Sequence, residues 1–185
     1  AAFVYSAQEA GTHYLAVSEA SYGGNNNFHY RLHVGTFPRP LSATPLGGSA
    51  GQALDVTWLG DSALSTQPLT LPAALGNQPL PVQLEQSIAP TPFPFRVSPF
   101  PGVLEAEPND SPDTATQGAV PGAFDGVIQA EGDADWFQFQ GTNGTKLDIK
   151  VWARSLGSPL DSVVAIHKPS SEGLASNDDS ARSEE

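Results

Sequence analysis

The sequence predicts an all-β protein, an antiparallel β-sandwich accompanied by a second, smaller sandwich. Its 185 residues include 17 prolines and 18 glycines but few lysines, a composition that favours short strands joined by turns over long helices. Short segments that alternate apolar and polar residues recur along the chain, as they do in half-buried strands. These observations exclude a helical bundle.

Residues 1–35 contain three strand patterns. In Phe28–Val34 every second residue is apolar, so one face is apolar and the other carries histidine and arginine side chains. Thr12–Val17 is the expected partner strand, and the loop Tyr22–Asn27 supplies residues that tolerate positive φ. Together with Phe3–Tyr5, these segments predict three antiparallel strands.

Residues 36–102 are expected to form the smaller sandwich. The segment Phe37–Pro40 is a stiff connector, because proline fixes φ and biases the residue before it away from helix. Short strands are then expected at Ala53–Leu59, Leu80–Leu84 and Phe95–Val97. Proline-rich flanks favour an edge position for the last of these strands. A second domain boundary is expected where this segment ends.

Residues 103–185 are expected to be β as well. One helical turn is expected at Ser111–Thr116, and the predicted strands are Gly126–Ala130, Trp136–Gln140, Lys146–Ala153 and Ser162–Lys168. The expected strand Lys146–Ala153 alternates well between apolar and polar residues. The turn Thr142–Thr145 before it contains Asn-Gly, which is a hairpin signal.

Charge and composition exclude several classes of protein. Twenty acidic residues against eight basic ones give a formal charge of −12, which repels nucleic acid and anionic membranes. No apolar run approaches the roughly twenty residues that span a bilayer, so no membrane insertion is expected. The chain has no cysteine, which excludes disulfides and thiolate metal sites. It also has no methionine, not even at its start. We expect a processed or excised piece of a protein, and an exported bacterial protein fits as well as a cytosolic one.

Acidic residues are concentrated where the last part of the chain begins. Residues 97–145 contain eight acidic residues and no lysine or arginine, and crowded carboxylates repel unless a cation lies between them. In an extended segment Glu105, Glu107 and Asn109 project to the same side, and Asp110 follows at its end. This pattern predicts a hard cation such as Ca²⁺, which takes oxygen ligands. The alternative is that these acids are solvated and that Asn109 and Asp110 cap turns.

The sequence offers no catalytic centre. His29 and His33 lie four residues apart on an expected strand, about 13 Å from one another, which is too far to share a zinc ion. Familiar nucleophile, zinc and phosphate-loop motifs are missing. Asp133 and Asp135 lie on one turn and lack the opposed geometry of a glycosidase pair. Trp152, expected on the polar face of its strand, is the aromatic residue to test for ligand contact. We therefore expect no enzyme here, although a catalytic domain elsewhere in the parent protein stays open.

Five segments, taken in order, carry a family resemblance: Glu107–Asp110, Gly126–Ile128, Gly132–Phe137, Ser158–Ser162 and Leu174–Asp179. In this order they resemble the bacterial pre-peptidase C-terminal (PPC) domain, a family of secreted β-sandwiches of jelly-roll or immunoglobulin-like type that accompany proteases and other exported proteins. The collagen-binding domains of clostridial collagenases are similar. Residues 36–102 resemble an immunoglobulin-like spacer of the IPT/TIG type.

The resemblance implies both a metal site and an unusual order of segments. It implies calcium ligands at Glu105, Glu107, Asn109, Asp110, Asp133 and Asp135. Residues 1–35 resemble the closing strands of the PPC domain, whereas residues 103–185 resemble its opening part. The module is then split around the spacer and is completed either within one chain or between chains. An incomplete sandwich exposes unpaired edges, which favours such complementation.

These observations predict a non-catalytic structural or adhesion module of a larger, multidomain, secreted bacterial protein. We expect it to be stiffened by calcium and to assemble by strand complementation, at the cell surface or in the extracellular space. Its expected partners are other domains or copies of the parent protein, including homo-oligomers formed by strand exchange. The alternative is an accessory module of a secreted hydrolase or peptidase that binds a polysaccharide or a fibrous protein.

Overall fold

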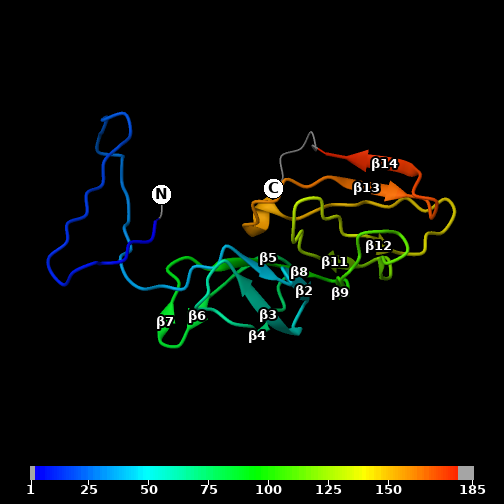
Figure 1. Cartoon of the computed structure of the whole chain (residues 1–185), viewed down its shortest axis with the longest axis horizontal. Helices are drawn as coiled ribbons and strands as arrows, with labels where there is room; N and C mark the ends of the chain where they lie inside the picture. The colour runs from blue at the N-terminus through cyan, green and yellow to red at the C-terminus, as the bar shows by residue number, and fades with distance from the viewer. Residues whose placement is uncertain (1–2, 179–185) are drawn as a thin grey trace. The chain divides into compact units, whose positions relative to one another are not determined.

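The structure, a computed structural model, describes residues 3–178 (Figure 1). Within this range the regular structure consists of fourteen short strands and one 3-10 turn, so the expected all-β class is confirmed. The chain divides into two compact units, Ala1–Val34 and Gly35–Glu185.

The first unit contains no strand between residues 3 and 34, and every residue in that range is exposed. The expectation of strands is therefore wrong for Phe3–Tyr5, Thr12–Val17 and Phe28–Val34. Local turns form instead: the N–H of Tyr22 donates to the carbonyl of Glu19 (3.1 Å), and that of Phe28 donates to the carbonyl of Asn25 (3.1 Å). Alternation alone does not order a segment, because ladder hydrogen bonds and packing must offset the entropy lost on ordering. Residues 3–34 are all exposed, so no buried face holds their alternating segments in strands.

The second unit begins with a small sandwich of two three-stranded sheets (Figure 1). The first sheet is antiparallel and has the order β1 (Ser42–Thr44), β3 (Ala53–Leu59), β4 (Gln67–Thr70). The second sheet has the order β2 (Gly47–Ser49), β8 (Phe93–Ser98), β5 (Gly76–Leu80), with β2 parallel and β5 antiparallel to β8. A short hairpin pairs β6 (Gln83–Leu84) with β7 (Ser87–Ile88).

The three expected strands of this part overlap β3, β5, β6 and β8, whereas β1, β2, β4 and β7 were not expected. The expected strand Ala53–Leu59 has the same bounds as β3. The expected strand Leu80–Leu84 is divided between β5 and β6, because Pro81 has no N–H to continue a ladder. The expected edge strand Phe95–Val97 lies in β8, which is the central strand of its sheet.

Burial explains the central place of β8. Its side chains alternate, with Phe93, Phe95 and Val97 buried between the sheets. From β3, the ring of Trp58 meets Phe93 and Phe95 edge to face, with centroids 5.5 and 5.7 Å away. Each such buried side chain stabilises the fold by roughly 1.5–3 kcal/mol, so the apolar face of β8 outweighs its proline-rich flanks.

In the remainder of the second unit, as far as Asp178, the structure describes three separate strand pairs. In the first pair β9 (Gly102–Leu104) runs parallel to β11 (Ala123–Asp125). In the second, β10 (Thr116–Gln117) runs parallel to β12 (Phe137–Gln138). The third is the antiparallel hairpin of β13 (Val164–His167) and β14 (Gly173–Asn177). The 3-10 turn η1 spans Arg154–Leu156.

Several expected elements in this part are absent or shortened. The expected strand Trp136–Gln140 is reduced to β12, and Ser162–Lys168 is reduced to β13. The segments Gly126–Ala130 and Lys146–Ala153 form no strand, and the expected helical turn at Ser111–Thr116 is a turn closed by a bond from the N–H of Thr114 to the carbonyl of Ser111. Leu147 and Ile149 are each 45% exposed, so no buried face holds their segment in a ladder. Residues 179–185 lie outside the described range.

Side chains connect this remainder to the small sandwich. The carboxylate of Asp125 accepts a hydrogen bond from the N–H of Leu46 (3.1 Å). The guanidinium of Arg96, on β8, lies 3.9 Å from the centroid of the Trp152 ring, and the ammonium of Lys150 lies 4.1 Å from it. Trp152 is therefore covered by two cations, a cation–π arrangement that stabilises the contact.

Candidate cation site

The acidic residues are held by main-chain hydrogen bonds on both sides. The N–H of Glu105 donates to the carbonyl of Asp125 (2.9 Å), which extends the pairing of β9 with β11. The N–H of Trp136 donates to the carbonyl of Asn109 (3.0 Å), and the carbonyl of Trp136 accepts from the N–H of Thr116 (2.8 Å). These bonds bring the segment that follows β9 beside the residues that precede β12.

Three carboxylates converge in this place. One oxygen from each of Glu105, Glu107 and Asp135 lies within 4.8 Å of the others. Oε1 of Glu105 accepts from the N–H of Val127 (2.8 Å), and Oε1 of Glu107 accepts from the side-chain amide of Gln129 (2.8 Å). Carboxylates this close repel one another, and one cation between them would convert the repulsion into attraction.

Asn109 adds a buried polar group to the carboxylates. It is 0% exposed, and its amide nitrogen lies 3.5 Å from Oε2 of Glu105. Its backbone N–H donates to Glu107 (2.8 Å). The buried oxygens Oδ1 of Asn109 and Oδ1 of Asp135 have no hydrogen-bond partner. Leaving a buried acceptor without a partner costs about 1–3 kcal/mol, and a bound cation would remove that cost.

The electrostatics indicate uncompensated negative charge. Burial raises the pKa of Glu105 from 4.5 to about 7, and the nearby charges of Asp135 and Glu107 add to the rise. The hydrogen bond from the N–H of Val127 favours the ionised carboxylate and acts to lower the pKa of Glu105. Burial also raises the pKa of Asp135, a hydrogen bond with Glu105 acts to lower it, and the charges of Asp133, Glu107 and Asp110 add to the rise. A divalent cation would lower both pKa values, because it favours the ionised forms.

Asp110 and Asp133 form a pair beside these residues. A hydrogen bond with Asp133 raises the pKa of Asp110, and the charge of Glu107 contributes to the rise. Asp133 also accepts from the N–H of Gln129. The structure thus gathers Glu105, Glu107, Asn109 and Asp135 in one cluster and places Asp110 and Asp133 in contact with each other.

Sequence reasoning overlooked Gly126, which it assigned to a strand. A Cβ atom at this position would lie 2.3 Å from an oxygen of Asp135 and 2.7 Å from an oxygen of Glu105. The absence of a side chain at Gly126 therefore allows both carboxylates to reach this point. The role of Gln129 as a donor to Glu107 was overlooked too. Gly126 belongs to a segment that carries the family resemblance, but the resemblance did not indicate that the residue makes room for the two carboxylates.

A cavity of about 600 Å³ adjoins the cluster. Glu105 and Glu107 lie in its wall with apolar side chains of both parts of the unit, among them Leu59, Leu104 and Ile128. The acidic residues therefore border the junction of the small sandwich with the remainder of the unit.

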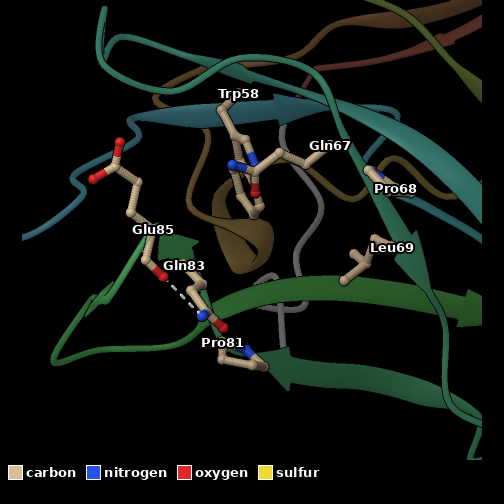
Figure 2. Close-up of a pocket in the computed structure, with 7 residues that line it drawn as sticks. All are labelled: Trp58, Gln67, Pro68, Leu69, Pro81, Gln83 and Glu85. Carbon is tan, nitrogen blue, oxygen red and sulfur yellow. Dashed lines mark hydrogen bonds between the residues drawn. The ribbon is translucent and has the colours of Figure 1, made fainter.

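A second cavity, of about 410 Å³, lies in the small sandwich and is drawn in Figure 2. Trp58 and Gln67 stand at one side of it, with Gln83 and Glu85 at another. The indole of Trp58 is only 5% exposed, and its N–H donates to Gln67 (3.3 Å). The ring is thus part of the core and is not an open platform on which a sugar could stack.

The other candidate groups do not assemble into a site. His29 and His33 are exposed, and His167 lies against Trp136 with ring centroids 4.8 Å apart. Among the described residues, the only group of three or more acidic, histidine or cysteine side chains with metal-binding spacing is Glu105, Glu107 and Asp135. In the same range, no helix has the length and apolar character needed to cross a membrane.

No family model matches this chain, and neither a curated protein nor a solved structure is similar to it at a significant level. The fold and the site therefore define an all-β protein with a candidate site for a hard cation. The resemblance to PPC domains rests on the sequence alone and stays a prediction.

Proposed function

We propose that this chain is a non-catalytic structural or adhesion module of a larger, secreted, multidomain bacterial protein, stiffened by one bound calcium ion. The observation that supports the calcium ion most strongly is the fully buried Asn109, whose side-chain oxygen has no partner beside three converging carboxylates. The resemblance to secreted PPC domains supports the proposed context.

Calcium suits these ligands better than the other common cations do. Glu105, Glu107 and Asp135 supply carboxylate oxygens, and Asn109 supplies an amide oxygen once its side chain faces the ion. Residues 97–145 contain no histidine and no cysteine, the ligands that favour zinc. Calcium accepts a flexible set of oxygen ligands, completed by water, whereas magnesium requires near-ideal octahedral geometry.

A structural role follows from the position of the site. Glu105 directly follows β9, and its N–H bonds to Asp125, whose carboxylate in turn accepts from Leu46 of the small sandwich. An ion held by Glu105 and Asp135 would restrain the chain at this junction.

Thermal unfolding with added CaCl₂ or with a chelator tests the calcium proposal. A ligand that binds only the folded state raises its stability, by about 2.7 kcal/mol at a concentration one hundred times Kd. We expect a higher midpoint with calcium and a smaller effect of magnesium. Asp135→Asn should lose the response, whereas Asp113→Asn, an exposed acid of the same region, should retain it. An unchanged midpoint in the unmodified protein would defeat the proposal.

The assembly part of the proposal is that strand-like segments of residues 3–34 pair with another copy of the chain. Phe28, Tyr30 and Leu32 alternate along one potential strand and are 56, 71 and 49% exposed. Sedimentation equilibrium over a range of concentrations should reveal self-association. Leu32→Lys should weaken it, while His29→Lys, on the opposite face of the alternation, should have less effect. A monomer at every concentration would contradict strand exchange between chains.

A further inference from the structure

The turn Thr142–Thr145 presents a reactive pair of residues that the proposed function does not use. Asn143 is followed by Gly144, and none of the other asparagines in the chain precedes a glycine. The N–H of Thr145 donates to the carbonyl of Thr142 (3.0 Å) and closes the turn. Gly144 has φ +81°, which suits the third position of a type II turn and favours glycine there.

The geometry leaves both reacting groups accessible. Asn143 and Gly144 are exposed, as are all residues from 141 to 150. Nothing lies within 4 Å of the position that a Cβ of Gly144 would occupy. Within the described range, neither the side chain of Asn143 nor the N–H of Gly144 makes a hydrogen bond that would hold it in place. No flanking strand restrains the turn, because the expected strand Lys146–Ala153 is not formed.

We infer that Asn143 is a site of spontaneous deamidation. Hydroxide removes the proton from the backbone nitrogen of Gly144, and this nitrogen attacks Cγ of Asn143. A five-membered succinimide forms, the bond from Cγ to the side-chain nitrogen breaks, and the nitrogen leaves as ammonia after taking a proton from water. Water then opens the imide at either carbonyl and leaves aspartate or isoaspartate at position 143. Each product carries one carboxylate in place of a neutral amide.

Asn109 provides an internal contrast. It is 0% exposed and is followed by Asp110, whose side chain crowds the attacking nitrogen. Its N–H and carbonyl are bonded to Glu107 and Trp136. These bonds hold the backbone and prevent the rotation that ring closure needs, so Asn109 should stay intact in the folded protein.

Peptide mapping by mass spectrometry of the full chain tests the inference. Cleavage after Arg96 and Lys146 places Asn109 and Asn143 in one peptide, residues 97–146, so both are measured under identical conditions. After incubation of the folded protein we expect a mass gain of about 1 Da localised to Asn143, with isoaspartate among the products. The rate should rise in proportion to hydroxide concentration. Asn143→Gln, which would need a larger ring, should show no such gain on the same timescale.

Two results would overturn the inference. The first is a folded protein in which Asn143 retains its amide while an unfolded sample loses it, because the turn would then be protective. The second is deamidation at Asn109 that is as fast as at Asn143, because exposure and the following glycine would then not be decisive.

Discussion

Replacing Glu105 with glutamine, in calcium-free buffer, should make the folded protein more stable at neutral pH. The substitution removes one of three converging carboxylates but keeps an oxygen that can accept from the N–H of Val127. The new amide can also donate to Asp135. We expect the free energy of unfolding to increase, because in the unmodified protein burial and repulsion oppose the ionisation of Glu105 in the folded state, and glutamine carries no charge.

The pKa of Glu105 sets the sign and the size of the effect. Its value rises from 4.5 in a solvated chain to about 7 in the folded protein, mainly because of burial. Below pH 4.5 the carboxyl is protonated in both states and contributes nothing, so stability should fall as pH rises from 4.5 to about 7. One pKa unit corresponds to about 1.4 kcal/mol. Glu105 is partly exposed, and solvent screening reduces the expected cost to roughly 1 kcal/mol.

Urea unfolding followed by circular dichroism, repeated across this pH range with chelator present, measures the effect. Glu105→Gln should flatten the pH dependence and gain about 1 kcal/mol above pH 7, and it should lose the stabilisation by calcium. Asp113→Asn controls for the loss of one negative charge. A variant that is less stable than the unmodified protein at neutral pH without calcium, with an unchanged pH dependence, would refute the reasoning.

Two further predictions concern the junction and the core. Burial raises the pKa of Asp125 from 3.8 to about 6. The contribution of Asp125 to stability should therefore decline as pH rises between these two values. Asp125→Asn should remove this pH dependence while keeping an oxygen that accepts from the N–H of Leu46. Asp125→Ala should instead lower the free energy of unfolding, measured in urea, by about 1–3 kcal/mol, because it leaves the N–H of Leu46 without an acceptor. Phe95→Ala, at a residue that is 0% exposed, should lower the free energy of unfolding by about 3–5 kcal/mol. The matched change Phe100→Ala, at a residue 41% exposed, should cost much less, and equal losses would contradict the assignment of the core.

Strands were predictable where local pattern and burial agree. Alternation at Ala53–Leu59 located β3 with its bounds, because Val56 and Trp58 pack into the core. The same kind of pattern at Lys146–Ala153 predicted a strand that does not form, because Leu147 and Ile149 stay exposed and the segment pairs with no neighbouring strand. Alternation reports what a segment could bury, and only long-range packing provides the partner.

The candidate site was predictable in part. Spacing along an extended segment predicted that Glu105, Glu107 and Asn109 share one side, and these side chains do lie together. The burial of Asn109 could not be read from the sequence, because it depends on the approach of the chain around Trp136. Gly126 is a similar case, since its importance lies in the space that it leaves for side chains distant in sequence.

By itself, the sequence determined the β class, the strong negative charge and the concentration of acids after the small sandwich. These properties depend on composition and on local periodicity, which every segment carries with it. Only the tertiary structure decided that β8 is a central strand, that residues 3–34 remain without strands, and that Asp135 reaches Glu105. Strand pairing, burial and charge proximity are set by contacts between residues far apart in the chain, and no local pattern contains them.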